Sequence, residues 1–409
     1  MKNKAWLVTI IVFLAGVTFS AGNFKVPPTM VVLLKEMNTG VAMGGWLMSM
    51  GMLAGIILAL PAGGIMMKTG PKKLGLFSLA CAVLGNLIGA VAPSFLVLML
   101  GRLIEGIGFG LIGVVAPAII AVWFPPEKRG FPMALWSIWI AVGMLFVFNA
   151  TNIILPAFGW RGNWWLVTVL AAVILALFAW LVKVPEPENK SSRQEASSAG
   201  PVSTLEGFKS PASWLLALVF AVFAFAVGVY TSFLPTFLIE TTGMDVATAN
   251  ATSSIATIGM IVGGFIMGFL LNTIKNRSML LVVSMVITAI FMYFSFKVTS
   301  PGMIIPFIFI IGIVYQLIPP IVFTVAPDTA ISPATIGISM GIVILGQNLA
   351  GFIAPALIGS VVESSGGNWD AATLPLVIAG LIGIAASLLY ASAMKKKTSI
   401  PLDPGIPAA

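Results

Sequence analysis

Long apolar stretches separated by short polar segments run along almost the whole chain. Each stretch has at least about 18 residues and few charges, enough to cross a bilayer as an α-helix. We place twelve of them, at residues 6–34, 43–67, 74–93, 95–122, 131–155, 163–183, 213–239, 248–272, 278–297, 302–325, 334–362 and 371–393. The pattern predicts an all-α integral membrane protein with twelve transmembrane helices.

One polar segment in the middle of the chain interrupts this pattern. Residues 185–211 are rich in Ser and Pro and mixed in charge, a composition typical of a flexible linker. Weak similarity between the flanking parts places Pro28 opposite Pro235 and Gly106 opposite Gly312. We therefore expect two pseudo-symmetric six-helix bundles at residues 1–184 and 212–394, a cytoplasmic linker at 185–211 and a cytoplasmic tail at 395–409.

Composition and charge narrow the class of protein further. Hydrophobic residues make up 59% of the chain and charged residues 8%, against about 25% charged residues in average chains. The loops leave no room for a catalytic domain, so we expect no enzyme activity and no cofactor. The chain lacks histidine, the commonest metal ligand, and we expect no metal site.

The net charge of +8 indicates how the spans are oriented. Lys and Arg cluster in the loops on the side of both termini, whereas the other side has only Lys35, Arg161 and Lys297. Basic loops stay in the cytoplasm, so we expect a multi-pass plasma-membrane protein with both termini cytoplasmic. The cations do not gather on a soluble face, as nucleic-acid binding would require. We expect a monomer in the lipid bilayer.

Three ionisable residues lie inside otherwise apolar spans: Lys25, Arg102 and Glu105. A charge in hydrocarbon is costly, and such residues usually face a cavity or a partner at a functional site. Lys25 and Arg102 both lie roughly 10 to 13 Å from the outer ends of their spans, at about 1.5 Å per helical residue. The excess of cations suggests a protein that handles an anion. Alternatively, Lys25 extends outward to the interface and Arg102 ties helices together.

Four short motifs resemble those of the major facilitator superfamily. Gly63–Lys73 resembles its loop G-x-L-A-D-R-x-G-R-K between spans two and three, with Met67 in place of the aspartate. That departure weakens the expectation of a charge latch between this loop and a helix. The other three motifs are the fourth-span motif R-x-x-x-G-x-G, the loop after span four and the loop before span six, at Arg102–Gly108, Trp123–Gly130 and Gly159–Arg161.

The resemblance covers the whole chain and implies a fold and a site. It implies two six-helix bundles with the substrate between them, spans one and four lining the cavity, and a gating or motif role for Gly63, Gly70, Gly106 and Gly108. Asn23–Pro27 is similar to the first-span element N-L-R-P of cyanate permease and nitroimidazole-transporter relatives, with Lys25 in place of arginine. Two cations at one level of the cavity then form an anion site, since Arg binds carboxylates in bidentate fashion and Lys adds a mobile charge.

Glu105 lies three residues after Arg102, so both occupy one helix face. One interpretation is a local ion pair that neutralises Arg102. The other is a proton carrier, because burial and the adjacent cation act in opposite directions on a carboxyl group and their balance changes with the state of the cavity. Glu105 is the leading in-membrane candidate for proton coupling.

The second half contributes uncharged polar residues to its spans. We expect Tyr230, Thr231, Gln316, Gln347 and Asn348 to contact the substrate, with hydrogen bonding between helices as the alternative. Proline breaks are expected near the site at Pro27–Pro28, Pro235 and Pro319–Pro320.

Together these features predict a secondary transporter that moves a small organic or inorganic anion by alternating access, with proton symport favoured. The alternatives are a drug or metabolite exporter of the same superfamily, an anion exchanger, or a non-transporting membrane sensor or scaffold. The fifth span lacks the dense glycine pattern of drug–proton antiporters, which lowers the expectation of drug efflux. The chain has no G-x-x-x-x-G-K-[ST] loop, so an ATP-driven mechanism is not expected.

Overall fold

Residues 2–58, 61–124, 130–183, 204–332 and 335–398 are described by a computed structural model. Twelve helical segments among them are long and apolar enough to cross a membrane, which confirms the expected spans. The helices of the first half are α1 (Lys2–Phe24), α2 (Met30–Glu36), α3 (Val41–Leu58), α4 (Pro61–Thr69), α5 (Pro71–Ala90), α6 (Phe95–Trp123), α7 (Gly130–Ser137), α8 (Trp139–Phe158) and α9 (Arg161–Leu181), with a short 3₁₀-helix η1 (Pro27–Thr29).

The second half repeats this all-helical organisation. Its elements are α11 (Thr204–Gly207), α12 (Pro211–Thr242), α13 (Val246–Thr273), α14 (Arg277–Phe294), α15 (Pro301–Tyr315), α16 (Ile318–Val325), η3 (Pro327–Thr329), α17 (Ile336–Ser364), η5 (Trp369–Ala372) and α18 (Thr373–Thr398). Most of the expected linker, residues 184–203, and the end of the expected tail, residues 399–409, lie outside the described residues.

Proline affects these helices in different ways. The first span breaks between α1 and η1, where Pro27 and Pro28 follow, and the tenth breaks between α15 and α16, just before Pro319 and Pro320. The expected break at Pro235 is wrong, because α12 runs through this residue from Pro211 to Thr242. A proline inside a transmembrane helix is tolerated where neighbouring groups satisfy the freed carbonyl.

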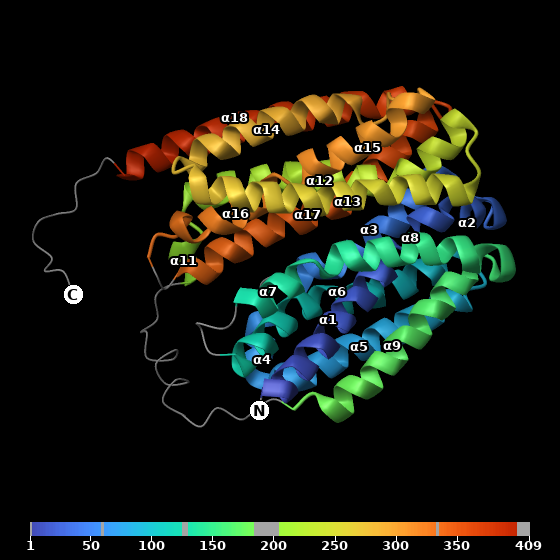
Figure 1. The fold of residues 1–409 in the computed structure, drawn as a ribbon, viewed down its shortest axis with the longest axis horizontal. Coiled ribbons are helices and arrows are strands. Elements are labelled where there is room, and N and C mark those ends of the chain that lie inside the picture. Colours follow the sequence, from blue (N-terminus) through green and yellow to red (C-terminus); the bar gives the residue numbers. More distant parts are fainter. Residues whose placement is uncertain (1, 59–60, 125–129, 184–203, 333–334, 399–409) are drawn as a thin grey trace, which may run out of the picture.

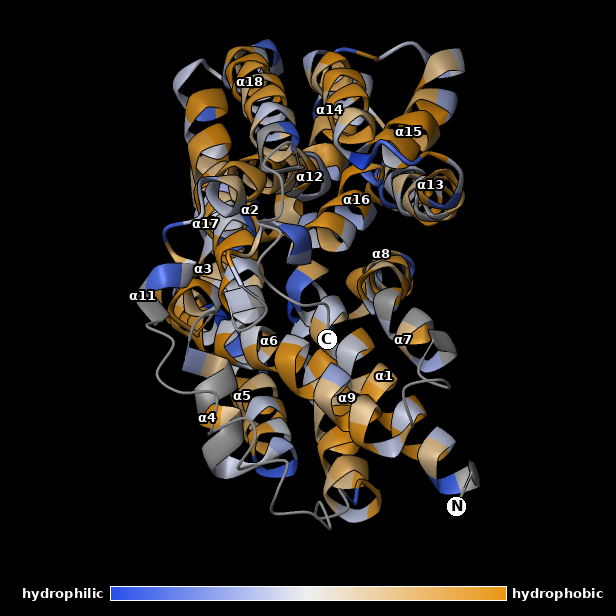
Figure 2. Cartoon of the chain, turned by 90° about the vertical axis from the view of Figure 1, so that its left-hand side faces the viewer, coloured by the Kyte–Doolittle hydropathy of each residue, from blue (hydrophilic) through white to orange (hydrophobic). Residues whose placement is uncertain are grey.

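The spans form two bundles that lie side by side (Figure 1). In the first bundle α5, α6 and α9 pack together and α1 packs on α6, α8 and α9; in the second, α12 packs on α17 and α18. Large apolar side chains, including Ile153, Trp180 and Phe265, are more than two thirds exposed. They belong to the apolar exterior seen in Figure 2, which suits a surface in contact with lipid.

We call the end where α1 begins and α18 ends the basal end, and the opposite end the distal end. The two bundles are joined mainly toward the distal end, through α3 with α17, α8 with α13, and η1 with α12. The Asn250 amide donates hydrogen bonds to the Pro28 carbonyl over 3.1 Å and to Asn152 Oδ1 over 3.2 Å. Buried Met30 and Leu33 belong to an apolar cluster that continues into the second half.

The contact between α3 and α17 is tight and includes a charged group. The Ala42 amide, in the first turn of α3, donates a 2.8 Å hydrogen bond to the carboxylate of Glu363 on α17. A carboxylate suits this place because the first amides of a helix have no partner within the helix and carry partial positive charge. A Cβ atom on Gly45 would lie only 2.1 Å from the Pro355 carbonyl oxygen, so the backbones of α3 and α17 touch directly.

We expect Glu363→Gln to increase the population that is open at the distal end by up to about fivefold, because the change removes the negative charge at the N-terminus of α3, which contributes about 0.3–1 kcal/mol. Double electron–electron resonance measures this population from the distances between spin labels at exposed Val91 and Ser300, one on each half. The matched control is Glu36→Gln, which removes an ion pair with Arg161 inside the first half. Identical distance distributions for the parent and both variants would show that Glu363 does not stabilise the closed distal end.

Candidate functional site

The site begins where α1 stops inside the membrane. Proline has no N–H, so Pro27 and Pro28 cannot donate to the carbonyls one turn earlier, and α1 ends at Phe24. The carbonyls at the end of a helix have no partner within it and form its negative pole. Those of Gly22 and Asn23 therefore offer buried acceptors in the middle of the first bundle.

Lys25, Arg102 and Glu105 meet at these carbonyls and share one carboxylate oxygen. Glu105 Oε2 lies 2.6 Å from Lys25 Nζ and 2.6 Å from Arg102 Nη1. Both cations also donate to the Gly22 carbonyl over 2.9 Å. The remaining Arg102 donors reach the Leu47 carbonyl of α3 over 3.2 Å and Asn23 Oδ1 over 3.0 Å. We call these three residues the charge cluster.

The charge cluster is buried and carries unequal charge. Lys25, Arg102 and Glu105 expose 0%, 1% and 6% of their surfaces. With every side chain ionised, two positive charges face one negative charge. Buried charges persist only when they are paired and fully hydrogen-bonded. Here one carboxylate and the negative end of α1 together compensate two cations.

Glycines let the helices approach closely enough to enclose the charge cluster. A Cβ atom on Gly51 of α3 would lie 2.6 Å from Arg102 Nη2, and one on Gly106 would lie 2.5 Å from the Gly51 carbonyl oxygen. On the other side of α6, a Cβ atom on Gly85 of α5 would lie 2.7 Å from Glu105 Cγ. Small residues at these positions bring α3, α5 and α6 into backbone contact.

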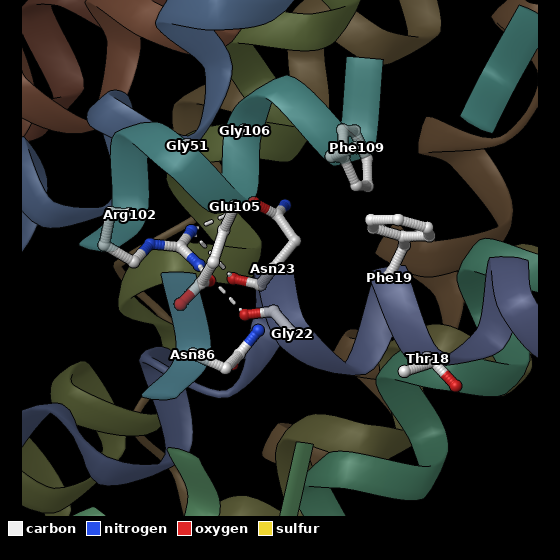
Figure 3. A pocket seen from close by; sticks show the side chains of 10 residues that line it. All are labelled: Thr18, Phe19, Gly22, Asn23, Gly51, Asn86, Arg102, Glu105, Gly106 and Phe109. Atoms are coloured by element: carbon white, nitrogen blue, oxygen red, sulfur yellow. Dashed lines mark hydrogen bonds and ion pairs between the residues drawn. The ribbon is translucent and has the colours of Figure 1, made fainter. Parts of the chain in front are cut away.

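An aromatic ring and a small cavity complete the surroundings. Lys25 Nζ lies 4.7 Å from the centre of the Trp164 ring of α9, a distance at which a cation is attracted to the ring face. The cavity is lined by the charge cluster's Arg102 and Glu105 together with Asn23, Asn86 and the rings of Phe19 and Phe109 (Figure 3). About 10 Å³ is open to a water-sized sphere, which is room for about one water molecule.

The structure brings together the three ionisable residues that the sequence singles out, and it confirms that Arg102 and Glu105 pair. The candidates of the second half lie elsewhere among the described residues. Tyr230 packs on Phe296 and Tyr315, and Thr231 donates to a carbonyl of its own helix. Asn348 donates to the Gly55 carbonyl of α3 over 3.1 Å, a helix–helix contact. Gln316 follows the end of α15, and Gln347 lies in α17.

The motif glycines have packing and backbone roles. Gly108 lies against Phe19 and the Ser78 carbonyl, where a Cβ atom would be within 2.6 Å of both. Gly70 precedes α5 with φ of 80°, a conformation that side chains other than glycine rarely adopt. Gly63 lies in α4.

Asn23, Asn86 and Trp164 are members of the site that the sequence did not identify as site residues. Asn23 stands two residues before Lys25, and Asn86 is a lone amide in an apolar span. Polar side chains in such places signal a site or a helix contact. Trp164 has no comparable signal, because tryptophan is frequent near membrane interfaces for unrelated reasons.

Comparison with known proteins assigns the fold and the class. The Major Facilitator Superfamily profile matches residues 9–355, and the chain belongs to this superfamily. With its twelve candidate spans, the protein is therefore a multi-pass membrane protein, as the motifs predict. Many solved structures share the fold, and two of them serve as examples. A D-xylose–proton symporter aligns with a TM-score of 0.72 and 17% identity over 94% of this chain and 97% of its own. A bacterial homologue of the human lysosomal transporter Spinster aligns with a TM-score of 0.73 and 16% identity over 99% of this chain and 100% of its own.

Relatives of the chain match over different lengths. The hexuronate transporter of Bacillus subtilis is 25% identical over 80% of this chain and 80% of its own length. The probable sulfoacetate transporter SauU of Cupriavidus necator is 26% identical over 78% and 77%. The chain spans much less of two other relatives. It covers 38% of the length of the MFS-type transporter YhcA of Bacillus subtilis and 37% of the length of the D-xylose transporter of Levilactobacillus brevis.

We expect Glu105→Gln to destabilise the protein more than Lys25→Met does. The first change leaves two buried cations without a counter-charge, at a cost of about 3–5 kcal/mol. The second leaves the neutral Arg102–Glu105 pair. Adding Lys25→Met to Glu105→Gln should therefore restore part of the loss. The measurement is the temperature at which half of the purified protein remains monodisperse.

Lys297→Met is the control for this series, because Lys297 pairs with the exposed Asp370. It should change stability by no more than about 1 kcal/mol. If Lys25→Met proves as damaging as Glu105→Gln, unbalanced positive charge is not what limits the stability of the charge cluster.

Proposed function

We propose that the protein transports a small anion and that Lys25 and Arg102 bind its negative group. The observation that carries this proposal is the pair of fully buried cations that share one carboxylate oxygen. Such a cluster keeps an unbalanced positive charge at a site enclosed by α1, α3, α5 and α6. A carboxylate or other oxyanion can replace Glu105 as their partner with the same hydrogen-bond geometry.

We propose that a proton on Glu105 accompanies the anion. Protonation removes the internal negative charge and frees both cations, whereas binding of the anion restores a negative partner. Empty, the cluster carries one net positive charge; loaded with one proton and a monovalent anion, it carries the same charge. The proton alone would leave two buried cations without a counter-charge, which is costly, and the anion removes that cost. The anion in turn binds better when Glu105 is protonated, because the neutral carboxyl group no longer competes with it for Lys25 and Arg102. Each ligand therefore promotes binding of the other, as a symporter requires.

Alternating access follows from movement of the two halves against each other. Parallel six-helix repeats of this kind rock around a site at their interface, and the distal contacts of α3, α8 and η1 would separate when the distal end opens. We propose that residues 1–184 and 212–394 are the two moving units. The positive loops support a cytoplasmic basal end with both termini in the cytoplasm, and we propose that the protein lies in the plasma membrane.

The substrate class follows from the relatives together with the site. Two relatives that match over most of their length are a hexuronate transporter and a probable sulfoacetate transporter, and both names denote anions. We propose a carboxylate or sulfonate of similar size, with Tyr230, Thr231, Gln316, Gln347 and Asn348 facing its uncharged part when the halves close around it.

Counterflow into proteoliposomes tests the anion. The panel is monocarboxylates, dicarboxylates, hexuronates, sulfoacetate, cyanate and nitrate, with D-xylose as the neutral comparison. Lys25→Ala and Arg102→Ala should each weaken binding of the transported anion a hundredfold or more, since unpairing a buried charge costs about 3–5 kcal/mol. Lys297→Ala is the control cation and should bind normally. Near-normal anion affinity in both cluster variants would place the substrate site elsewhere.

A second experiment tests coupling. Glu105→Gln imitates the protonated carboxyl group, so the variant should still exchange substrate across the membrane but should not concentrate it under an imposed pH gradient. Uptake and exchange are measured in the same proteoliposomes, and the parent protein serves as the reference. A Glu105→Gln protein that still accumulates substrate against its gradient would exclude Glu105 as the coupling residue.

A further inference from the structure

Two hydrogen-bond acceptors face the small cavity without a donor. Glu105 Oε1 and Asn86 Oδ1 are both buried, and neither receives a hydrogen bond from the described residues. Both residues line the same cavity, and Figure 3 shows them there together with Gly22 and Arg102. Buried polar atoms are nearly always paired, so this pair of acceptors requires an explanation.

In each side chain, the hydrogen bonds of the other polar atom show which atom is left unpaired. Lys25 and Arg102 both donate to Glu105 Oε2, so Oε1 is the carboxylate oxygen without a donor. The Asn86 amide nitrogen donates to the Ala82 carbonyl over 2.8 Å. Its oxygen is therefore the atom of the amide that has no hydrogen-bond partner among the described residues. An ionised carboxylate and an amide oxygen are both acceptors and cannot bond to each other.

A proton resolves this mismatch. When Glu105 is protonated on Oε1, that atom becomes a donor and Asn86 Oδ1 becomes its acceptor. Protonation on Oε2 would instead direct an O–H toward the ammonium of Lys25 and the guanidinium of Arg102, which are both donors. We propose that Glu105 and Asn86 form the proton-binding site of the transporter, in which Asn86 holds the proton on Glu105 Oε1 across the small cavity.

This inference rests on the proposed function, in which Glu105 carries the proton, and adds Asn86 as its positioning residue. Contact between the helices supports it, since Gly85, next to Asn86, lies against Glu105. The charged groups that touch Glu105 are Lys25 and Arg102. The other ionisable groups on the described helices packed around it are Cys81 within α5, and Lys2, Lys4, Lys72, Lys73 and Arg161 at the starts of α1, α5 and α9.

Two substitutions at Asn86 separate this role from simple packing. Asn86→Leu removes the acceptor, so the pH at which proton-driven uptake is half-maximal should fall by about one unit, the equivalent of one hydrogen bond. Asn86→Asp adds a carboxylate that shares the proton, so the same pH should rise. A packing role predicts weaker transport in both variants and no shift in opposite directions. Ser78→Ala is the control, because Ser78 also ties α5 to α6 through the Gly108 carbonyl; it should leave the half-maximal pH unchanged.

Infrared difference spectra of the purified full-length protein give a readout that does not depend on transport. The carbonyl band of protonated Glu105, identified by its loss in Glu105→Gln, should move to higher frequency in Asn86→Leu. If Glu105→Gln lacks pH-driven uptake but Asn86→Leu leaves both the half-maximal pH and this band unchanged, Asn86 is not the acceptor. If Glu105→Gln keeps pH-driven uptake, the proposed coupling fails instead.

Discussion

The rest of the structure depends on one carboxylate oxygen shared by two buried cations. Glu105 Oε2 bonds Lys25 and Arg102 at once, and without it two like charges would face each other away from water. The surrounding features make this contact possible. Proline ends α1 so that its last carbonyls can accept from the cations, and glycines of α3, α5 and α6 remove the side chains that would keep the helices apart.

In the proposed mechanism, the contact that stabilises the empty protein is also the one that the anion replaces. A neutral and fully paired cluster would not attract an anion. Without Glu105, the charges of Lys25 and Arg102 would be buried in a low-dielectric interior with no counter-charge. The excess of one positive charge lies between these extremes. Stability and binding therefore draw on the same two cations, and protonation of a single group can shift the balance between them.

A charged contact also joins the halves at the distal end. In the motif loop between spans two and three, Met67 replaces the aspartate that could hold a helix by its charge. Glu363 contacts the first turn of α3 at the opposite end of the span. A carboxylate at a helix N-terminus favours the arrangement in which the distal ends touch. This charged contact between the halves therefore lies at the distal end, away from the motif loop.

The sequence by itself determined the twelve spans, the bias of cations toward one side, the family and the three ionisable residues of the site, because each follows from local composition or a short motif. Tertiary structure alone decided that one oxygen of Glu105 serves both cations, since Lys25 lies 80 residues away along the chain. It also decided that Asn86 and Trp164 belong to the site and that Pro235 leaves α12 intact. These outcomes depend on which helix faces meet and how closely glycine lets them approach, and neither can be read from a single segment.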